Sequence, residues 1–553
     1  MKQSIIILGF IFLAVLNVHA QDKDSVAMVN DFKVAMPSLP QLPVFKNDTM
    51  DIRREGAVGD GLALNTSAIN NAINEISKRG GGVVLIPGGI WLTGPVELKS
   101  NVNLHVDRDA VVLFTKDKSR YHLFESEWEG HKAMCNQSPL YGENLENIAI
   151  TGGGVFDGNG DVWRPVKKDK LTAEAWNALL SYGGVLSDDG KTWYPSESYI
   201  KGSKTKDASV ISPDKTMNDY LAVKDFFRPN LLVLKNCKNV LLDNATFQNS
   251  PAWCLHTLMC TNLTVRNIRV KNPAYAQNGD GIDVESCSNV LIEGSTFTCG
   301  DDGICIKSGR DEFGRRRGMP TQNVIVRSNI VYHAHGGFVI GSEMSGGAHN
   351  IFVYDNSFLG TDNGLRFKTV RGRGGVVSNI YISDIYMKDI VNDAILFDMY
   401  YMATASAVGG AQDSIYPVTV ATPQFHDFKI SNVVCAGAKR GLFVRGIPEM
   451  HVKDVALKNI TLQAAKGVDI IEAANISLEN IILKTKDTKS LIDLHNATNV
   501  SFNKVSSDDA LKSIFSVSGQ RNKNITASGV TVPQAKNKVE FSSDADKASF
   551  HLQ

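Results

Sequence analysis

The sequence predicts an all-β fold: a right-handed parallel β-helix whose N-terminal end is capped by one helix. A short motif recurs along the chain, an asparagine followed by alternating apolar and polar residues and then a turn residue. Most copies are separated by spacings in the middle and high twenties of residues, without helical patterns between them. One such unit cannot bury its own apolar side, whereas stacked units can. The copies begin at Asn239, Asn262, Asn289, Asn323, Asn350, Asn379, Asn475, Asn499 and Asn524.

The constant phase of the motif favours stacked coils over a β-sandwich, because a sandwich would not repeat one signature in register. We expect the asparagines to form a ladder at one corner of the coils, where their side chains bond to turn backbone. Cys237, Cys260 and Cys287 each stand two residues before a motif asparagine. They should therefore stack as buried thiols and not pair in disulfides.

Residues 66–78 have the apolar period of an amphipathic helix. This helix is expected to cover the open N-terminal end of the stack, which would otherwise expose apolar side chains and strand edges. We expect residues 51–553 to form a single catalytic β-helix domain. The apolar residues on one side of the helix are Ala68, Ile69, Ala72, Ile73 and Ile76.

The first residues resemble an export signal. Lys2 precedes an apolar run from Ile5 to Val18, and small residues end at Ala20 before a polar stretch. We therefore expect residues 1–20 to be a signal peptide, residues 21–50 to be a linker or wrapping arm, and the protein to be periplasmic or extracellular.

Composition excludes two classes of partner. The 58 basic residues balance the 58 acidic ones, so no global field favours nucleic acid. After the signal, no apolar run is long enough to span a bilayer, so we expect no membrane insertion. We also expect a monomer.

A segment at about residues 162–223 interrupts the repeat. Its aromatic residues include Trp163, Trp176, Trp193 and Tyr194. A long insertion must leave the body of a solenoid as a loop, and such loops often shape a binding face. The alternative is a packed excursion with a small core of its own.

Polar residues suited to chemistry recur on successive coils. Asp301 and Asp302 stand side by side in "TCGDDGICIKSG", and Asp280 in "NGDGID" comes 21 residues earlier. His335 follows 34 residues after Asp301, and Arg366 follows 31 residues after His335, with Lys368 beside it. Because each step approximates one coil, we expect these groups to line one open groove. Each motif alone has a simpler explanation, such as a solvated turn or a calcium loop, but their common phase favours a site.

These motifs are similar to a known family. The chain resembles the polygalacturonases of glycoside hydrolase family 28, whose signature is Asn-Thr-Asp, Asp-Asp, Gly-His-Gly and Arg-x-Lys. The resemblance covers roughly residues 50–450 and includes "NSPAWCLH" and "GGGVVLIPGG". Gly279 replaces the usual threonine and Ala334 the usual glycine or serine, two positions that supply no catalytic group. The matching segments are Asn278-Gly279-Asp280, Asp301-Asp302, Ala334-His335-Gly336 and Arg366-Phe367-Lys368.

The resemblance implies an inverting hydrolase of α-1,4-galacturonosyl linkages in polygalacturonan or pectin. Asp301 would be the acid, Asp280 and Asp302 would position and activate water, and His335 would tune the acid. Inversion calls for carboxyl groups about 6.5–9.5 Å apart. Crowding of three carboxylates should raise one pKa and keep that acid protonated.

Substrate binding needs cations, because galacturonate carries a carboxylate. Arg366 could clasp that carboxylate and Lys368 could add a point charge. The other substrate-binding candidates are Asn278, Tyr401, Lys307 and Arg310. We expect neither a metal nor another cofactor.

Four alternatives remain. A β-helical pectate lyase would use the aspartates for calcium, and a non-catalytic carbohydrate-binding β-helix would not use them at all. Rhamnogalacturonan hydrolases and endo-acting polygalacturonases are the alternatives within the family. We favour release from a chain end, because the insertion and the loop "RDEFGRRRGMP" could block one end of the groove. Arg310, Arg315, Arg316 and Arg317 in that loop could hold a terminal carboxylate; the alternative is a solvated cationic edge.

Overall fold

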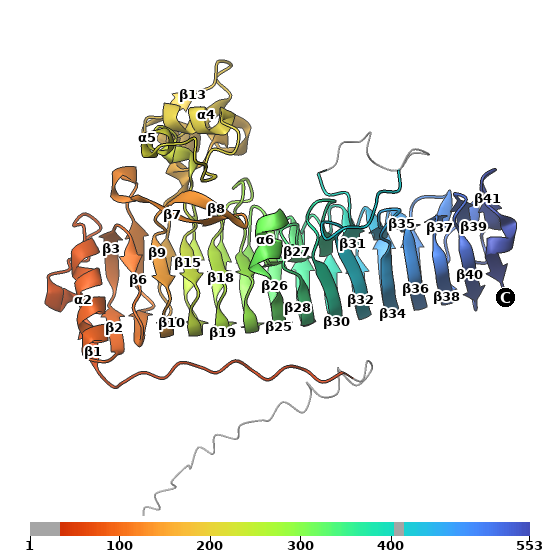
Figure 1. The fold of residues 1–553 in the computed structure, drawn as a ribbon, viewed down its shortest axis with the longest axis horizontal. Helices are drawn as coiled ribbons and strands as arrows, with labels where there is room; N and C mark the ends of the chain where they lie inside the picture. The colour runs from red at the N-terminus through yellow and green to blue at the C-terminus, as the bar shows by residue number, and fades with distance from the viewer. Residues whose placement is uncertain (1–33, 403–413) are drawn as a thin grey trace, which may run out of the picture. The chain divides into compact units, whose positions relative to one another are not determined.

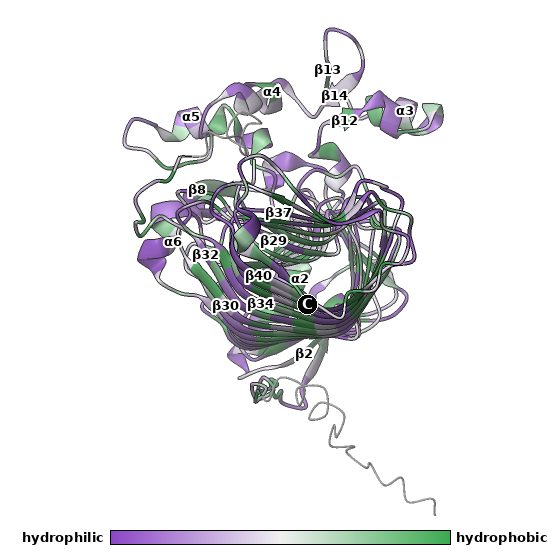
Figure 2. Ribbon diagram, turned by 90° about the vertical axis from the view of Figure 1, so that its right-hand side faces the viewer, coloured by the Kyte–Doolittle hydropathy of each residue, from purple (hydrophilic) through white to green (hydrophobic). Residues whose placement is uncertain are grey.

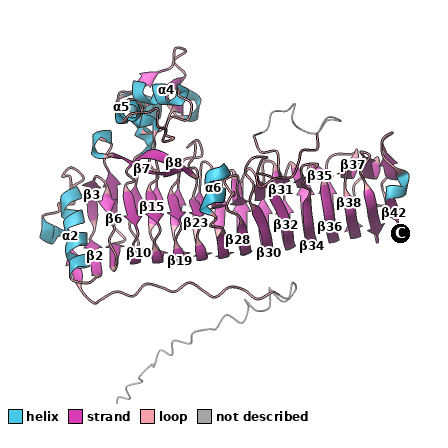
Figure 3. Cartoon of the chain, in the orientation of Figure 1, coloured by secondary structure: helices cyan, strands magenta, loops and turns pink. Residues whose placement is uncertain are grey.

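The computed structural model describes residues 34–402 and 414–553, and residues 37–553 form one compact unit. Within that unit, coils of short parallel strands follow one another from α2 to β42 (Figures 1 and 3). The predicted right-handed parallel β-helix is confirmed. The expected signal peptide and residues 21–33 of the expected arm lie outside the described residues. Residues 37–48 contain neither helix nor strand and lead into β1.

One face of the coils is a parallel sheet of 14 strands, which carries most of the candidate site residues. Its strands pair in chain order, one from each coil. They are β4 (Val96–Glu97), β9 (Leu140–Glu143), β15 (Leu232–Lys235), β18 (Leu255–Leu258), β21 (Ile282–Glu285), β24 (Asp302–Lys307), β27 (Gly336–Ile340), β29 (Leu365–Lys368), β31 (Asp393–Asp398), β33 (Arg440–Arg445), β35 (Lys466–Ile471), β37 (Ser490–His495), β39 (Ser513–Ser518) and β41 (Asn537–Phe541).

The remaining faces form a 23-stranded sheet. Its early coils contribute two short strands each, which merge from β28 onward into long strands that turn the corner. The first row is β1 (Thr49–Asp51), β2 (Gly82–Ile86), β5 (Val102–Val106), β10 (Glu146–Thr151), β16 (Lys238–Asp243), β19 (Thr261–Arg266), β22 (Ser288–Glu293), β25 (Thr321–Arg327), β28 (Ala348–Leu359), β30 (Val376–Lys388), β32 (Gln424–Ala436), β34 (Val452–Ala464), β36 (Ala473–Thr485), β38 (Thr498–Ser506), β40 (Lys523–Ser528) and β42 (Phe550–Leu552). The second row is β3 (Gly89–Thr93), β6 (Ala110–Phe114), β11 (Val155–Asp157), β17 (Thr246–Gln248), β20 (Arg269–Lys271), β23 (Thr296–Thr298) and β26 (Ile330–Tyr332).

Viewed along the stack, the two sheets enclose one interior (Figure 2). Apolar side chains from every coil fill it, and equivalent positions stack on one another. Phe156 and Phe247, for example, lie in stacked geometry with ring centroids 5.3 Å apart. Such stacking is the burial that a single coil could not achieve alone.

Helix α2 (Thr66–Lys78) caps the N-terminal end. Its five predicted apolar residues are all buried, and it packs against β1, β2, β4 and β5. The amphipathic pattern therefore predicted both the helix and the face that it buries.

The asparagines form the predicted ladder. Asn239, Asn262 and Asn289 adopt left-handed backbone conformations, with φ of 55°, 56° and 58°. Asparagine tolerates this region better than most residues. The Asn262 amide donates to the Asn239 side-chain oxygen at 2.9 Å and accepts from the Asn289 amide at 2.5 Å. Each asparagine therefore turns the chain and bonds to its neighbours in the adjacent coils.

The predicted thiol stack is also present. Cys237, Cys260 and Cys287 are buried at equivalent positions of adjacent coils, and all three are free thiols. The Cys287 sulfur accepts a hydrogen bond from the Cys260 backbone amide at 3.3 Å. These residues act as small core side chains.

Two elements leave the coils near the N-terminal half. The hairpin β7 (Leu123–Trp128) and β8 (His131–Asn136) is antiparallel. The segment after β11 contains β12 (Val166–Lys167), β13 (Val185–Leu186) and β14 (Thr192–Tyr194). Its helices are α3 (Ala173–Leu180), α4 (Glu197–Lys204) and α5 (Met217–Leu221), and the short helix α6 (Asp311–Arg317) follows β24. The 3-10 turns are η1 (Ile52–Glu55), η2 (Lys118–Arg120), η3 (Gly160–Val162), η4 (Lys168–Lys170), η5 (Lys224–Phe226) and η7 (Lys547–Ser549).

The tryptophans of the insertion are turned inward. Trp176 and Trp193 pack with Val166 and Leu179 in a small core, and Trp163 is buried against Tyr121. The alternative of a packed excursion therefore describes these tryptophans better than an aromatic binding face. No helix within residues 34–402 and 414–553 is long and apolar enough to cross a membrane.

Candidate active site

The candidate site lies where β21, β24 and β27 begin. Residue Ile282 pairs with Ile304, and Asp302 pairs with Gly336. Asp280 therefore lies level with Asp302, and Asp301 lies level with His335. The one-residue difference from the predicted 21-residue step arises because the coil between these strands is 22 residues long.

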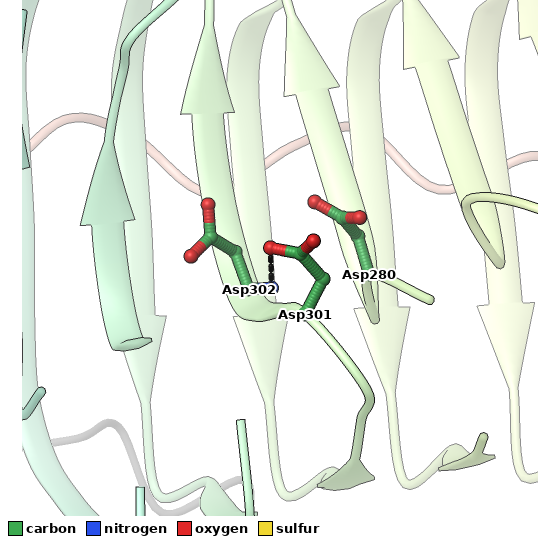
Figure 4. A group of neighbouring side chains, drawn as sticks. All are labelled: Asp280, Asp301 and Asp302. Carbon is green, nitrogen blue, oxygen red and sulfur yellow. Dashed lines mark hydrogen bonds between the residues drawn. The ribbon is translucent and has the colours of Figure 1, made fainter. Parts of the chain in front are cut away.

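Three carboxylates meet at this point (Figure 4). One oxygen of each of Asp280, Asp301 and Asp302 lies within 4.8 Å of the others. Asp280 and Asp302 are 3% and 1% exposed, whereas the Asp301 side chain is 22% exposed. Asp301 also accepts a hydrogen bond from the Asp302 backbone amide at 3.0 Å, drawn as the dashed line in Figure 4. Asp301 is therefore the carboxyl group of the three that best reaches a bound molecule.

The separation is shorter than predicted. The expected range for inverting enzymes is about 6.5–9.5 Å, but the nearest oxygens here lie within 4.8 Å. The reason is the fold, because neighbouring parallel strands are about 4.8 Å apart. Equivalent positions on adjacent coils must therefore be one strand spacing from each other.

The same proximity suits either a shared proton or a metal ion. Three carboxylate oxygens at this distance could all contact one divalent cation. Asp302, however, is already neutralised by two side chains. Arg366 donates to one of its oxygens at 3.0 Å and Lys368 to the other at 2.7 Å. This reduces the negative charge left for a cation.

These cations determine the ionisation of Asp302. Burial acts to raise its pKa, but the charges of Lys368, Arg366 and Lys307 outweigh burial and hold the pKa well below its usual value. Asp302 is therefore a carboxylate, able to accept a proton or a hydrogen bond from water.

Asp280 has the opposite environment. Burial, together with the charges of Asp283 and Asp301, raises its pKa well above the usual value. One of its oxygens, Oδ1, has no hydrogen-bond partner among the described residues. The expected pKa increase from crowding is thus present on Asp280. The physical reason is that Asp280 is buried without a cation of its own.

His335 contacts the exposed carboxylate as predicted. Its Nδ1 lies 3.1 Å from Asp301 Oδ1, and its Nε2 lies 3.8 Å from Asp362 Oδ2. The hydrogen bond to Asp301 raises the pKa of His335 despite partial burial. The imidazole therefore favours the protonated form beside Asp301.

Arg366 and Lys368 belong to the site, but they occupy other positions than predicted. Arg366 pairs with Val339, so it lies four residues further along its strand than the level of His335. Both side chains reach back to Asp302, and Lys368 is only 4% exposed. In this structure the two cations bind an aspartate, whereas a substrate carboxylate was the expected partner. Tyr401 lies over both, with its ring centre 5.6 Å from the Arg366 guanidinium carbon and 4.8 Å from Lys368 Nζ.

Lys307 and Arg310 differ from the prediction. Lys307 is 4% exposed and donates to Glu343 at 2.8 Å beneath the ring of Trp253. Arg310 is paired with Glu129 at 3.2 Å. Both cations are engaged by internal carboxylates, which leaves them unsuited to direct substrate binding.

The predicted arginine loop is instead helix α6. Arg315 donates to two backbone carbonyls, and Arg316 forms an exposed pair with Glu312 on the helix surface. Arg317 is buried in ion pairs with Glu127 and Glu285. These contacts hold the helix in place, and the role of the arginines in gripping a terminal carboxylate stays a prediction.

Comparisons with known proteins point to one family. Residues 216–422, which include all the candidate residues, match the model of glycosyl hydrolases family 28. Over these residues the chain is similar to glycoside hydrolase family 28. A crystal structure of a hyperthermoactive exopolygalacturonase from Thermotoga maritima is 29% identical, with a TM-score of 0.64, and the match covers 81% of this chain and 94% of that one.

Relatives in family 28 are named either as exo-acting or as endo-acting enzymes. An exo-poly-alpha-D-galacturonosidase of Dickeya chrysanthemi is 28% identical over 69% of this chain, and the chain spans 61% of that enzyme's length. An endo-polygalacturonase of Pectobacterium carotovorum is 26% identical over 62% of this chain and 74% of that enzyme. Similarity to the family therefore does not by itself decide between cleavage at a chain end and cleavage within the chain.

One departure from the family 28 signature has a structural reason. A Cβ atom at Gly279 would lie 2.7 Å from the backbone oxygen of Ala276. The loop before β21 therefore leaves no room for the usual threonine. Asn278, in the left-handed region with φ of 53°, accepts from Arg228 at 2.8 Å and is thereby fixed beside the site.

Sequence reasoning missed a buried network behind the family 28 aspartates. Asp283 is fully buried, and its carboxylate lies 3.6 Å from the Lys307 ammonium; burial raises its pKa well above normal. His256 contacts Glu285 at 2.9 Å. Burial acts to raise the pKa of Glu285, but the bonds from His256 and Arg317 lower it to about 2. The signal was available in "NGDGID" and "NSPAWCLH", whose polar residues sit at strand positions.

The hairpin β7–β8 was not predicted, and it roofs the strands that precede the aspartates. Trp128 stacks on Trp253 with ring centroids 4.9 Å apart. Glu127 and Glu129 near its tip pair with Arg317 and Arg310. A pocket of about 150 Å³ remains beneath it, lined by residues that include Trp128, Tyr141, Arg228, His256 and Asn278.

Proposed function

We propose that this family 28 protein hydrolyses α-1,4-galacturonosyl linkages of polygalacturonan from a chain end. The observation that carries this proposal is the accessible Asp301, hydrogen-bonded to His335 and flanked by two buried aspartates, beside a cleft that the β7–β8 hairpin roofs on one side. Acid catalysis needs a carboxyl group in reach of the leaving oxygen, and a second carboxylate to activate water.

The roles follow from the environments. Asp301 donates the proton to the leaving oxygen, since it is the exposed member of the cluster. Asp302, held ionised by Arg366 and Lys368, accepts a proton from the attacking water. Asp280 lies level with Asp302 on the adjacent strand and orients that water. His335 holds Asp301 in place and, when protonated, supplies positive charge to it.

The direct attack of water predicts inversion at the anomeric carbon. The short distance between the carboxyl groups makes an independent measurement necessary, because retaining enzymes have carboxyl groups about 5–5.5 Å apart. Proton NMR of the first product formed shows whether the configuration at the anomeric carbon is inverted or retained. Initial release of the β-anomer from the α-linked substrate supports the proposal, and initial release of the α-anomer contradicts it.

Action from a chain end is supported by the β7–β8 hairpin, which covers one side of the cleft. Trp128, Glu127 and Glu129 fix the hairpin over β15 and β18, so a polymer cannot continue along the sheet in that direction. On the other side of the site the sheet continues from β29 to β41. A chain lying in the groove therefore has one end at the aspartates.

Viscosity measured together with reducing-end release tests this mode. An end-acting enzyme liberates galacturonate or a short oligomer while viscosity falls slowly, whereas an early collapse of viscosity means internal cleavage. Products that lack an unsaturated uronate distinguish hydrolysis from elimination. We further propose that the protein is exported to the periplasm or the cell exterior, which fractionation of expressing cells would test.

A further inference from the structure

A second groove lies on the 14-stranded sheet, beyond the catalytic strands. It has a volume of about 670 Å³ and extends over β33, β35, β37, β39 and β41. From β24 to β37 there are six strand steps, which is about 29 Å at the usual strand spacing of about 4.8 Å. Neither the catalytic aspartates nor the cations that bind them line this groove. It also lies outside residues 216–422, the part that matches the family model.

A row of basic side chains follows the groove from coil to coil. Arg440 pairs with Lys466 on the next strand. Lys489 and Lys512 stand immediately before β37 and β39, whose first residues pair with each other. The register therefore provides one cation per coil over four successive coils, at the same edge of the sheet.

Two cations of the basic row, Lys489 and Lys512, are available to a ligand. Arg440 and Lys466 are each bound by two aspartates, whereas Lys512 has one partner, Glu540 at 3.0 Å, and its side chain stays 64% exposed. Lys489 is exposed, and no ion pair of its side chain is found within residues 34–402 and 414–553. Exposed lysines of this kind hold mobile ammonium groups that can be shared with an arriving carboxylate.

The rest of the lining suits hydroxyl groups. Ser490, Ser516 and Ser518 line the groove with hydroxyls, Asp493 bonds to Ser490, and the ring of His495 bonds to Ser518 and Asn496. Sugar hydroxyls both donate and accept hydrogen bonds, so a mixed lining of carboxylate, hydroxyl and imidazole can bind them. The periodic cations add specificity for a glycan that carries one carboxylate per sugar.

We propose that this groove is a second binding site for an acidic polysaccharide, and that it holds the body of the polyuronate chain whose end reaches Asp301. The inference rests on the proposed function, because a chain whose end is held at Asp301 leaves the site along β29 to β41. Each exposed pair contributes little alone. Several pairs on one polymer act together and raise the effective concentration of its end at the catalytic site.

The test measures binding separately from turnover. Polygalacturonate and trigalacturonate are titrated calorimetrically into the Asp301→Asn protein, in which cleavage should be about a thousandfold slower. In this background Lys489→Glu with Lys512→Glu should weaken polymer affinity about tenfold and leave the affinity of a trimer for the catalytic site unchanged, because a trimer bound at the aspartates does not span the distance of about 29 Å to the second groove. Lys489→Gln with Lys512→Gln should weaken it about threefold, since no repulsion is added.

Two matched substitutions on the opposite sheet serve as the control. Lys484 on β36 and Lys523 on β40 are exposed, so Lys484→Glu with Lys523→Glu makes the same charge change away from the groove. Unchanged polymer affinity in the groove variant would overturn the inference. So would an equal loss in the control pair, which would reduce the effect to net charge.

Failure of the proposed function gives a different result. The Lys489→Glu/Lys512→Glu protein with Asp301 intact should keep the parental kcat/KM on trigalacturonate while losing efficiency on the polymer. If even the parent fails to hydrolyse trigalacturonate and polygalacturonate, the proposed hydrolysis is wrong. The second groove is then still tested by whether polymer affinity depends on Lys489 and Lys512.

Discussion

Asp280 and Asp302 are chemically identical and lie level with each other on adjacent strands, yet their pKa values move in opposite directions. Both are almost completely buried, so burial alone would raise both pKa values. The difference comes from Arg366 and Lys368, which contact Asp302 only. The two long side chains thus decide which carboxyl group stays ionised in the free enzyme.

Asp301→Asn should lower kcat by about a thousandfold without changing the fold. General acid catalysis contributes about 10²–10⁴ in rate, and an amide cannot deliver the proton. The amide oxygen can still accept the hydrogen bond from the Asp302 backbone. Reducing-end assays and circular dichroism measure the two effects. Asp355→Asn, at an exposed corner with φ of 54°, is the matched control and should keep full activity. Substantial activity in folded Asp301→Asn would refute its assignment.

His335 predicts a pH-dependent contribution to stability. Its pKa is raised by Asp301, so the folded state holds the proton more tightly than the unfolded state. The stabilisation is complete below the unfolded value of about 6.5 and is lost as pH rises through the folded pKa. Thermal unfolding should therefore show His335→Gln destabilised relative to the parent at pH 5, with the difference vanishing by pH 9.

His349 provides a comparison of opposite sign. Burial lowers its pKa, so protonation favours the unfolded state. His349→Gln should thus gain stability relative to the parent as pH falls through the unfolded value. A difference that grows with rising pH in His335→Gln would contradict the described hydrogen bond to Asp301.

Among the elements, the β7–β8 hairpin determines access to the groove. Trp128 on Trp253 and the two glutamates near its tip fix a two-stranded element that would be marginal alone. The hairpin packs against Ala208 and Tyr220 of the insertion through Met134. The insertion thus supports the hairpin, and its tryptophans pack inside it.

Shortening the hairpin should change the mode of cleavage. Replacing residues 126–133 by Asn-Gly keeps the pairing of Glu125 with Met134 and removes the roof. We expect viscosity to fall several times faster for each reducing end released. The control shortens the β13–β14 turn at residues 187–191 and should change nothing. The same viscosity profile in both variants would mean that the hairpin does not block the groove.

The asparagine ladder is the element that sets coil geometry. Asn262→Gly keeps the left-handed backbone and removes the side-chain bonds to Asn239 and Asn289. Asn262→Ala removes the same bonds and also puts a residue that disfavours the left-handed conformation at this position. Urea denaturation should show the alanine variant about 1–2 kcal/mol less stable than the glycine variant. Equal stability would mean that the backbone conformation is not a constraint here.

At the scale of the whole molecule, stacking puts one strand spacing between equivalent residues. That spacing separates Asp280 from Asp302, and Asp301 is the chain neighbour of Asp302, so the three carboxylates meet at one point. Arg366 and Lys368 already supply positive charge to the cluster.

We therefore expect activity on polygalacturonate to persist in excess chelator. Reducing-end release before and after dialysis against EDTA measures this, and added calcium should not stimulate it. The control is a calcium-dependent pectate lyase in the same buffers. Loss of activity that calcium restores would favour elimination, and the products would then absorb as unsaturated uronates.

The sequence by itself determined the repeating parts of this protein. The asparagine phase, the apolar side of residues 66–78 and the cysteine register are local patterns, and each fixes a corner, a cap or a core position directly. The residues Asp280, Asp301, Asp302 and His335 were also identifiable, because one coil is one repeat and the repeat shows which residues are neighbours.

Only the tertiary structure decided which of those groups are ionised and which of them a ligand can reach. Long cationic side chains choose partners across coils, so Arg366 and Lys368 bind Asp302 and Lys307 binds Glu343. The hairpin at residues 123–136 lies over strands that follow it by more than a hundred residues. Such contacts depend on side-chain reach and on loops that carry no period, and a periodic sequence pattern contains no information about either.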